Sequence, residues 1–219
     1  MMLVVSGMIS VGKSTVSKAV GEEMGLEVFY ESVEDNPILP LFYTESPEEQ
    51  ERKRYPFLLQ LHFLYTRFNA IKQAISAGQA ILDRSLYEDH YFAKVNHKLG
   101  KISDMELDIY EGILNSMMEE IQGMPKKAPD LNIYLKASFE TVLKRLKERG
   151  REFEQDEGLI EYYRLLWEGY DEWLEKEYAA SDVLIIDMDN LDIVHNPNDR
   201  AYLITEVKRS LAKLNENQI

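Results

Sequence analysis

The chain lacks cysteine entirely, so neither disulfide bonds nor thiolate metal sites can form. This absence fits a reducing compartment. The sequence also lacks any apolar run of about 18 residues, the length that a membrane-spanning helix needs. The opening apolar run, residues 1–6, is too short for a signal peptide and leads directly into glycine. We therefore expect a cytoplasmic protein with no membrane partner.

Positive charge is scarce as well. The 219 residues include 25 Lys and Arg against 39 Asp and Glu, which gives a net charge of −14. The phosphates of DNA and RNA would repel such a chain, so we expect no polymeric nucleic acid as a partner. Internal repeats and long Gly/Ser/Pro linkers are missing too, while 45% of the residues are hydrophobic. We expect a single domain with a large core.

Short apolar runs rich in β-branched residues alternate with longer amphipathic stretches, which indicates an α/β fold with a five-stranded parallel sheet flanked by helices. The predicted strands span residues 3–6, 28–31, 80–84, 131–136 and 183–187. The predicted helices span residues 14–24, 52–77, 103–122, 139–149, 159–178 and 199–214. The densely charged residues 44–54 are interpreted as a solvated loop. Functional residues are expected at the carboxyl ends of the strands, where ligands of such sheets collect.

The first predicted strand runs into a match to G-x-x-x-x-G-K-[ST], formed by Gly7, Met8, Ile9, Ser10, Val11, Gly12, Lys13, Ser14 and Thr15. The glycines let successive N–H groups curl around a phosphate, and the helix N-terminus adds partial positive charge. Lys13 would reach the β- and γ-phosphates of ATP, and the Ser14 hydroxyl would bind Mg²⁺. The motif indicates a nucleoside triphosphate but does not identify the acceptor of its phosphoryl group.

Charged residues end two further predicted strands. Glu31 could serve as a general base that accepts a hydroxyl proton, or simply cap the following helix. Asp83 could bind Mg²⁺, and Arg84 could bind phosphate or hold Glu31 in place. These positions predict a site for phosphoryl transfer, because that reaction depends on positioning and charge neutralisation.

Three arginines fall within seven residues of this acidic chain, at Arg145, Arg149 and Arg151. Their spacing would bring several guanidiniums over one ligand, as a lid of about residues 145–158 that stabilises the transferring group. The alternative is a helix C-terminus that basic residues complement. The Tyr and Trp residues between 162 and 173 are interpreted as packing, and the four histidines are assigned no chemistry.

Together these motifs resemble the deoxynucleoside kinase family, specifically its bacterial deoxyadenosine/deoxyguanosine kinase branch. The resemblance runs from Gly7 to about Asn196, nearly the whole chain. Besides the phosphate loop, it is carried by Glu31 and residues 36–43, 57–60, 83–89 and 149–155. It implies a P-loop kinase fold, a homodimer formed through helices in the 52–122 region, and ATP-dependent phosphorylation of a deoxynucleoside.

The resemblance also implies roles for individual residues. Glu31 is then the base on the 5′-hydroxyl and Arg84 assists it. Tyr43 and Glu154 hold the sugar 3′-hydroxyl, and Gln60, Arg67 and Asp89 surround the nucleobase. An amide such as Gln60 both donates and accepts, so it can pair bidentately with an adenine edge, which favours deoxyadenosine over deoxyguanosine.

Two other functions share parts of this pattern. A nucleoside monophosphate kinase of the thymidylate type also combines a phosphate loop with a strand that ends in Asp-Arg. Its acceptor carries about two negative charges, which Glu31 would repel because no arginine lies between residues 26 and 36. A nucleotide-dependent switch is the non-enzyme alternative, although the sequence has no Asn-Lys-x-Asp motif for guanine.

Overall fold

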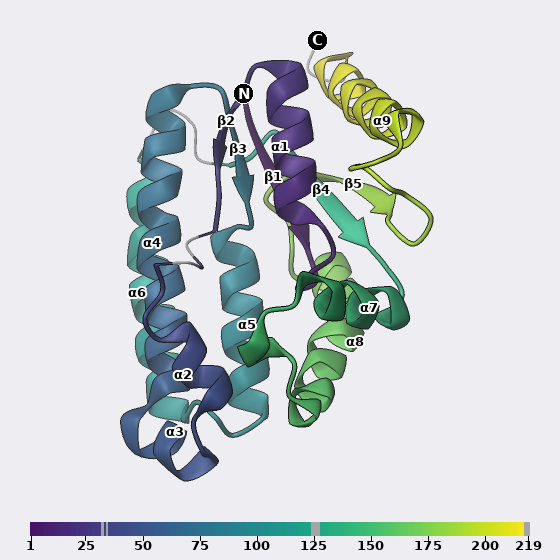
Figure 1. Cartoon of the computed structure of the whole chain (residues 1–219). Helices are drawn as coiled ribbons and strands as arrows, with labels where there is room; N and C mark the ends of the chain where they lie inside the picture. The colour runs from purple at the N-terminus through teal and green to yellow at the C-terminus, as the bar shows by residue number, and fades with distance from the viewer. Residues whose placement is uncertain (32, 34, 124–127, 217–219) are drawn as a thin grey trace.

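Five parallel strands form one sheet in the computed structural model, in the order β2-β3-β1-β4-β5 (Figure 1). The structure describes residues 1–31, 33, 35–123 and 128–216. The strands are β1 (Met2–Gly7), β2 (Glu27–Phe29), β3 (Ala80–Asp83), β4 (Leu131–Lys136) and β5 (Asp182–Asp187). The predicted five-stranded parallel sheet is confirmed.

The central strand β1 shows why the sheet is covered on both faces. Its side chains alternate between two cores: Leu3 and Val5 belong to one, and Met2 and Val4 to the other. All six residues of β1 are buried, as expected for a parallel strand covered by helices. In the register of the sheet, Val5 lies opposite Asp83, the last residue of β3, so β1 extends two residues past the end of β3.

Helices cover the two faces, and some of them extend past the carboxyl ends of the strands (Figure 1). They are α1 (Lys13–Met24), α2 (Leu39–Thr44), α3 (Pro47–Lys53), α4 (Tyr55–Ala77), α5 (Leu86–Lys98), α6 (Asp104–Gln122), α7 (Phe139–Arg149), α8 (Ile160–Lys176) and α9 (Pro197–Glu216), with 3₁₀ turns at Glu152–Glu154 and Glu157–Leu159. α1 and α9 contribute to the core of Leu3 and Val5, while α4 and α6 pack on the face of Met2 and Val4. Within the described residues, no helix is both long and apolar enough to cross a membrane.

Two sequence predictions about the charged segment are wrong. Residues 44–54 are not a loop, because α3 forms there with Ser46 as its N-cap. Acidic residues occupy its first turn and basic residues its last, so their charges interact favourably with the helix dipole and stabilise the helix. None of its side chains is buried. Arg54 then takes a left-handed conformation (φ 55°) and separates α3 from α4, which splits the predicted helix 52–77.

The sequence prediction also missed α5 and misplaced the end of β2. α5 buries Glu88, Asp89 and Asn96 along with its apolar residues, so its inward face does not show the apolar period of a core helix. β2 ends at Phe29 rather than at residue 31. Glu31 therefore lies in the connection after the strand and not on it.

Candidate active site

A cavity of about 660 Å³ opens beyond the carboxyl ends of β1, β2 and β3. Most of the residues that the sequence singled out line it: Ile9, Ser10, Gly12, Lys13, Ser14, Thr15, Glu31, Tyr43, Gln60, Asp83, Arg84, Asp89, Arg145, Arg149, Arg151 and Glu154. The predicted residues outside its lining are Gly7, Met8, Val11 and Arg67. Residues that lie far apart in the sequence, from the phosphate loop to Glu154, thus line one cavity. This is expected because the carboxyl ends of parallel strands lie at the same edge of the sheet.

The phosphate loop connects β1 to α1. A Cβ atom at Gly7 would lie 2.7 Å from the Leu135 carbonyl oxygen, so the loop can turn here only with glycine. Gly12 precedes α1 with a φ of 109°, which also favours glycine. The Lys13 ammonium folds back over the loop and donates to the Met8 carbonyl at 2.9 Å. Burial, helped by the positive charge of Arg84, lowers the pKa of Lys13 to about 8.

Arg145 holds the phosphate loop from outside. Its Nη1 donates to the Val11 carbonyl at 2.6 Å, and its Nη2 donates to the Met188 carbonyl at 2.7 Å. The guanidinium therefore joins the loop to the segment after β5. Since Arg145 also lines the cavity, it can contact a ligand while it fixes the loop.

Ser14 and Asp83 form an oxygen pair beside the loop. The Ser14 hydroxyl donates to Asp83 Oδ2 at 2.6 Å, and Asp83 Oδ1 is buried without a hydrogen-bond partner among the described residues. Magnesium binds through one or two carboxylates, hydroxyls, phosphate oxygens and water, so this pair fits such an ion. The described residues contain no cluster of three or more His, Cys, Asp or Glu that could hold a metal by themselves.

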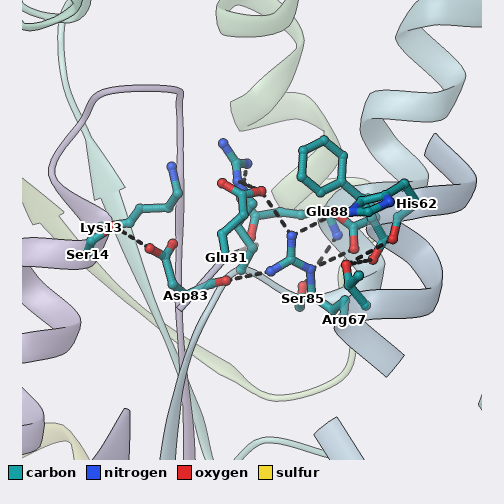
Figure 2. A network of polar contacts seen from close by, with 12 residues as sticks. Lys13, Ser14, Glu31, His62, Arg67, Asp83, Ser85 and Glu88 are labelled. Carbon is teal, nitrogen blue, oxygen red and sulfur yellow. Dashed lines mark hydrogen bonds and ion pairs between the residues drawn. The ribbon is translucent and has the colours of Figure 1, made fainter. Parts of the chain in front are cut away.

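Glu31 sits between two arginines (Figure 2). Its Oε1 lies 3.0 Å from Arg67 Nη2 and 3.1 Å from Arg84 Nε. Burial alone would raise the pKa of Glu31, but these arginines and Lys13 outweigh it and lower the pKa to about 2. Arg84 thus contacts Glu31, as one of its two interpreted roles requires. The absence of arginine from residues 26–36 does not leave Glu31 alone, because both partners come from distant parts of the chain.

Arg67 organises this side of the cavity from α4. Its Nε and Nη2 bind the two oxygens of Asp89 at 2.7 and 3.2 Å, and its Nη1 donates to the Asp83 carbonyl at 2.6 Å. Arg67 therefore pairs with Asp89, and its guanidinium binds the surrounding protein groups rather than lining the cavity. Asp89 itself lines the cavity, as does Gln60, whose residue is only 2% exposed.

The arginine-rich segment also lines the cavity, through Arg149, Arg151 and Glu154. Arg149 Nη2 donates to the buried Glu154 carboxylate, and Arg151 Nη1 lies 3.5 Å from its other oxygen. Tyr43 of α2 also lines this part, and its ring stacks on Phe153 with centroids 5.8 Å apart. Glu154 thus keeps both arginines beside the cavity.

Sequence reasoning missed several residues of this site. Apolar and aromatic side chains also line the cavity, among them Leu59, Phe63, Phe92 and Tyr162, of which Tyr162 had been assigned to packing. Glu88 of α5 was part of a recognised motif without a role, yet its carboxylate binds both the phosphate loop and Arg84. Glu88 was not assigned a position because the sequence analysis did not predict α5.

Comparison with known proteins agrees with this geometry. Residues 3–212 match the family model for deoxynucleoside kinase. A deoxyguanosine kinase of Lactobacillus johnsonii is 43% identical over 217 residues, which cover 98% of this chain and 92% of that protein. A deoxyadenosine kinase of Lactobacillus acidophilus is 40% identical and covers 97% of each chain. Relatives of both names are thus similar to this chain at nearly full length.

Solved structures give the same result. A deoxyadenosine kinase from M. mycoides with bound dATP has a TM-score of 0.77 and 29% identity, and the match covers 97% of this chain and 100% of that one. The same enzyme with bound dCTP also has a TM-score of 0.77, with 28% identity. The expected P-loop kinase fold is confirmed. With its phosphate loop, its buried carboxylates and this full-length match, the chain belongs to the deoxynucleoside kinase family.

Proposed function

We propose that the protein transfers the γ-phosphoryl group of ATP to the 5′-hydroxyl of a purine deoxynucleoside, giving the monophosphate and ADP. The observation that carries this proposal is the shared cavity, in which Glu31 and the phosphate loop line the same space. A nucleoside hydroxyl placed there lies between a carboxylate and a bound triphosphate. This arrangement suits phosphoryl transfer, in which little is needed beyond positioning and charge stabilisation.

The donor side would be formed by the loop amides, Lys13, and the arginines Arg149 and Arg151. The side chains of all three cationic residues line the cavity. These cations would stabilise the negative charge that spreads over the transferring group. Ser14 and Asp83 would hold Mg²⁺, which neutralises phosphate charge when it is bound. Residues 145–158 would act as the lid over the triphosphate.

On the acceptor side, Glu31 would accept the hydrogen of the 5′-hydroxyl. Its lowered pKa keeps it ionised at neutral pH, and Arg84 and Arg67 fix its position. Because the transition state is loose, the proton can leave late, and orientation of the hydroxyl matters more than the strength of the base. Arg84 would assist Glu31 by holding it in place.

The nucleoside itself would extend away from the phosphate loop. Tyr43 and Glu154 would hold the 3′-hydroxyl, while Gln60 and Asp89 meet the nucleobase. The Gln60 amide is buried and needs a partner, which supports pairing with a base edge. We favour adenine because an amide matches its donor and acceptor edge, although relatives named for either purine are similar to this chain.

An assay of ADP formation tests this function, with deoxyadenosine, deoxyguanosine and dTMP as separate acceptors. We expect turnover with both purine deoxynucleosides, faster with deoxyadenosine, and none with dTMP. Faster turnover with dTMP would favour the monophosphate kinase alternative. No turnover with any acceptor would favour a nucleotide-binding switch.

The lowered pKa of Lys13 predicts a pH dependence. Below a pKa of about 8 the ammonium is charged and can bind phosphate, and above it the charge is lost. We therefore expect kcat/KM for ATP, which reports the free enzyme, to fall roughly tenfold per pH unit at pH values well above 8. A kcat/KM profile that stays flat up to pH 10 would contradict this role of Lys13.

We propose that the protein is a homodimer, joined through α4 and α6. These helices pack together, and they carry exposed large apolar side chains, among them Tyr65 (51% exposed) and Ile109 (48%). An Ile109→Lys substitution should convert the dimer to a monomer, as measured by analytical ultracentrifugation. Val194→Lys changes an exposed aliphatic residue before α9 and should leave the dimer intact. A parent protein that sediments as a monomer would contradict the proposal.

A further inference from the structure

Glu88 is a fully buried carboxylate that belongs to the polar network in Figure 2. Its Oε1 accepts hydrogen bonds from the Gly7 amide at 3.1 Å, from Arg84 Nη1 at 3.1 Å and from the Tyr170 hydroxyl. These three donors come from the start of the phosphate loop, the end of β3 and the middle of α8. Glu88 does not line the cavity, so it acts on the site through other residues.

Helix capping does not account for this carboxylate. Ser85 caps α5 and Glu88 stands three residues later, the spacing of a capping box. In α6 the same spacing gives a complete capping box, in which the Glu106 side chain accepts from the Ser103 amide at 2.9 Å. The Glu88 carboxylate instead binds Gly7 and Arg84. The Glu88 carboxylate therefore points toward residues of the active site and does not cap its own helix.

Hydrogen bonding alone does not account for a charge at this position either. Burial raises the pKa of Glu88, so the ionised form is costly there unless a cation compensates it. A neutral amide could accept the bonds from Gly7 and Tyr170. What an amide would lack is the ion pair with Arg84, whose Nε faces Glu31 at 3.1 Å while its Nη1 faces Glu88.

Arg84 needs such support because its backbone conformation is unfavourable for a residue with a side chain. It is one of three described non-glycine residues with positive φ, at 77°. Such a conformation persists only where the surroundings hold it, and it occurs often at functional sites. The two carboxylates bind the guanidinium from two directions and so fix the side chain that holds Glu31.

We propose that Glu88 is a positioning residue for phosphoryl transfer, which fixes Arg84 beside Glu31 and couples both to the first amide of the phosphate loop. Tyr170 joins α8, the helix that follows the arginine-rich segment, to the same carboxylate. The inference rests on the proposed function, because Arg84 and Glu31 act in that reaction. Glu88 would therefore affect the rate of transfer more than the binding of either substrate.

Glu88→Gln tests the charge without changing the shape of the side chain. We expect kcat to fall at least tenfold, while KM for ATP and for the deoxynucleoside changes less than threefold. The melting temperature is measured in parallel, because a purely structural role would lower stability and leave kcat of the folded enzyme unchanged. A fall in kcat of less than tenfold overturns the inference.

A matched pair of Tyr→Phe variants covers the case in which Glu88→Gln fails to fold. Tyr170 and Tyr134 stack on each other, but Tyr170 donates to Glu88 whereas Tyr134 donates to Asp171. Relative to Tyr134→Phe, we expect Tyr170→Phe to lower kcat at least threefold, and a smaller difference overturns the inference. The parent enzyme is assayed alongside: its failure to turn over any deoxynucleoside would overturn the proposed function, whereas unchanged variants of an active parent would overturn only the role of Glu88.

Discussion

Replacing Glu31 by Gln should lower kcat by about 10²–10⁴-fold, the usual cost of removing a general base. Gln has the same shape and can still lie between Arg67 and Arg84, but it cannot take the proton of the acceptor hydroxyl. The loss should appear in kcat, with KM for ATP nearly unchanged, because the phosphate loop is untouched. Steady-state kinetics with deoxyadenosine at saturating ATP would measure it.

Glu27→Gln is the matched control for this experiment. Glu27 is an exposed carboxylate on β2, four residues before Glu31 and outside the lining of the cavity. Its replacement should leave kcat within about twofold of the parent, as expected of a surface substitution. If Glu31→Gln also stayed within about threefold of the parent, the assignment of the base would have to be abandoned.

Replacing Arg67 by Met should destabilise the protein by about 3–5 kcal/mol, because it leaves buried carboxylates without their cation. Arg67 is 5% exposed and binds Asp89, Glu31 and the Asp83 carbonyl at once. For a chain of this size that loss corresponds to a fall in melting temperature of roughly 6–20 °C. Thermal unfolding followed by circular dichroism would measure it.

An exposed ion pair supplies the control for Arg67. Arg52 of α3 binds Glu49 at 2.5 Å, with two thirds of the arginine side chain in solvent. Solvent screens such a pair, so Arg52→Met should leave the melting temperature close to that of the parent. An equal effect of the two substitutions would show that the buried network around Arg67 contributes no more than a surface pair.

The local parts of the site were predictable from the sequence. The phosphate loop is a continuous motif between a strand and a helix, and its chemistry depends on neighbouring residues and backbone N–H groups. Asp83 and Arg84 were found because they end an apolar strand, and strand ends in a parallel sheet share one edge. The same reasoning brought Glu31 to this edge, although β2 ends two residues before it.

The tertiary parts could not be predicted in this way. The sequence suggested Arg84 as a partner of Glu31, but spacing along the chain does not reveal that Arg67, 36 residues away, binds the same carboxylate. The electrostatic argument against a monophosphate acceptor assumed a carboxylate without these cations and no longer holds. A nucleoside acceptor is favoured instead by membership of the deoxynucleoside kinase family.

Glu88 was overlooked for a related physical reason. Polar residues on the buried face of α5 interrupt the apolar period by which core helices are found in a sequence. Their burial makes sense only once Arg67 and Arg84 are in place, since each cation compensates an acidic residue of α5. The structure shows buried charge networks of this kind, but the pattern of hydrophobic residues in the sequence does not predict them.

A crystal structure of the protein with deoxyadenosine and a non-hydrolysable ATP analogue tests the proposed chemistry most directly. We predict the 5′-oxygen within hydrogen-bonding distance of the Glu31 carboxylate and in line with the γ-phosphate in the loop of residues 7–15. A 5′-oxygen that points away from Glu31, or a nucleoside bound outside this cavity, would contradict the role of Glu31 and the function proposed for the protein.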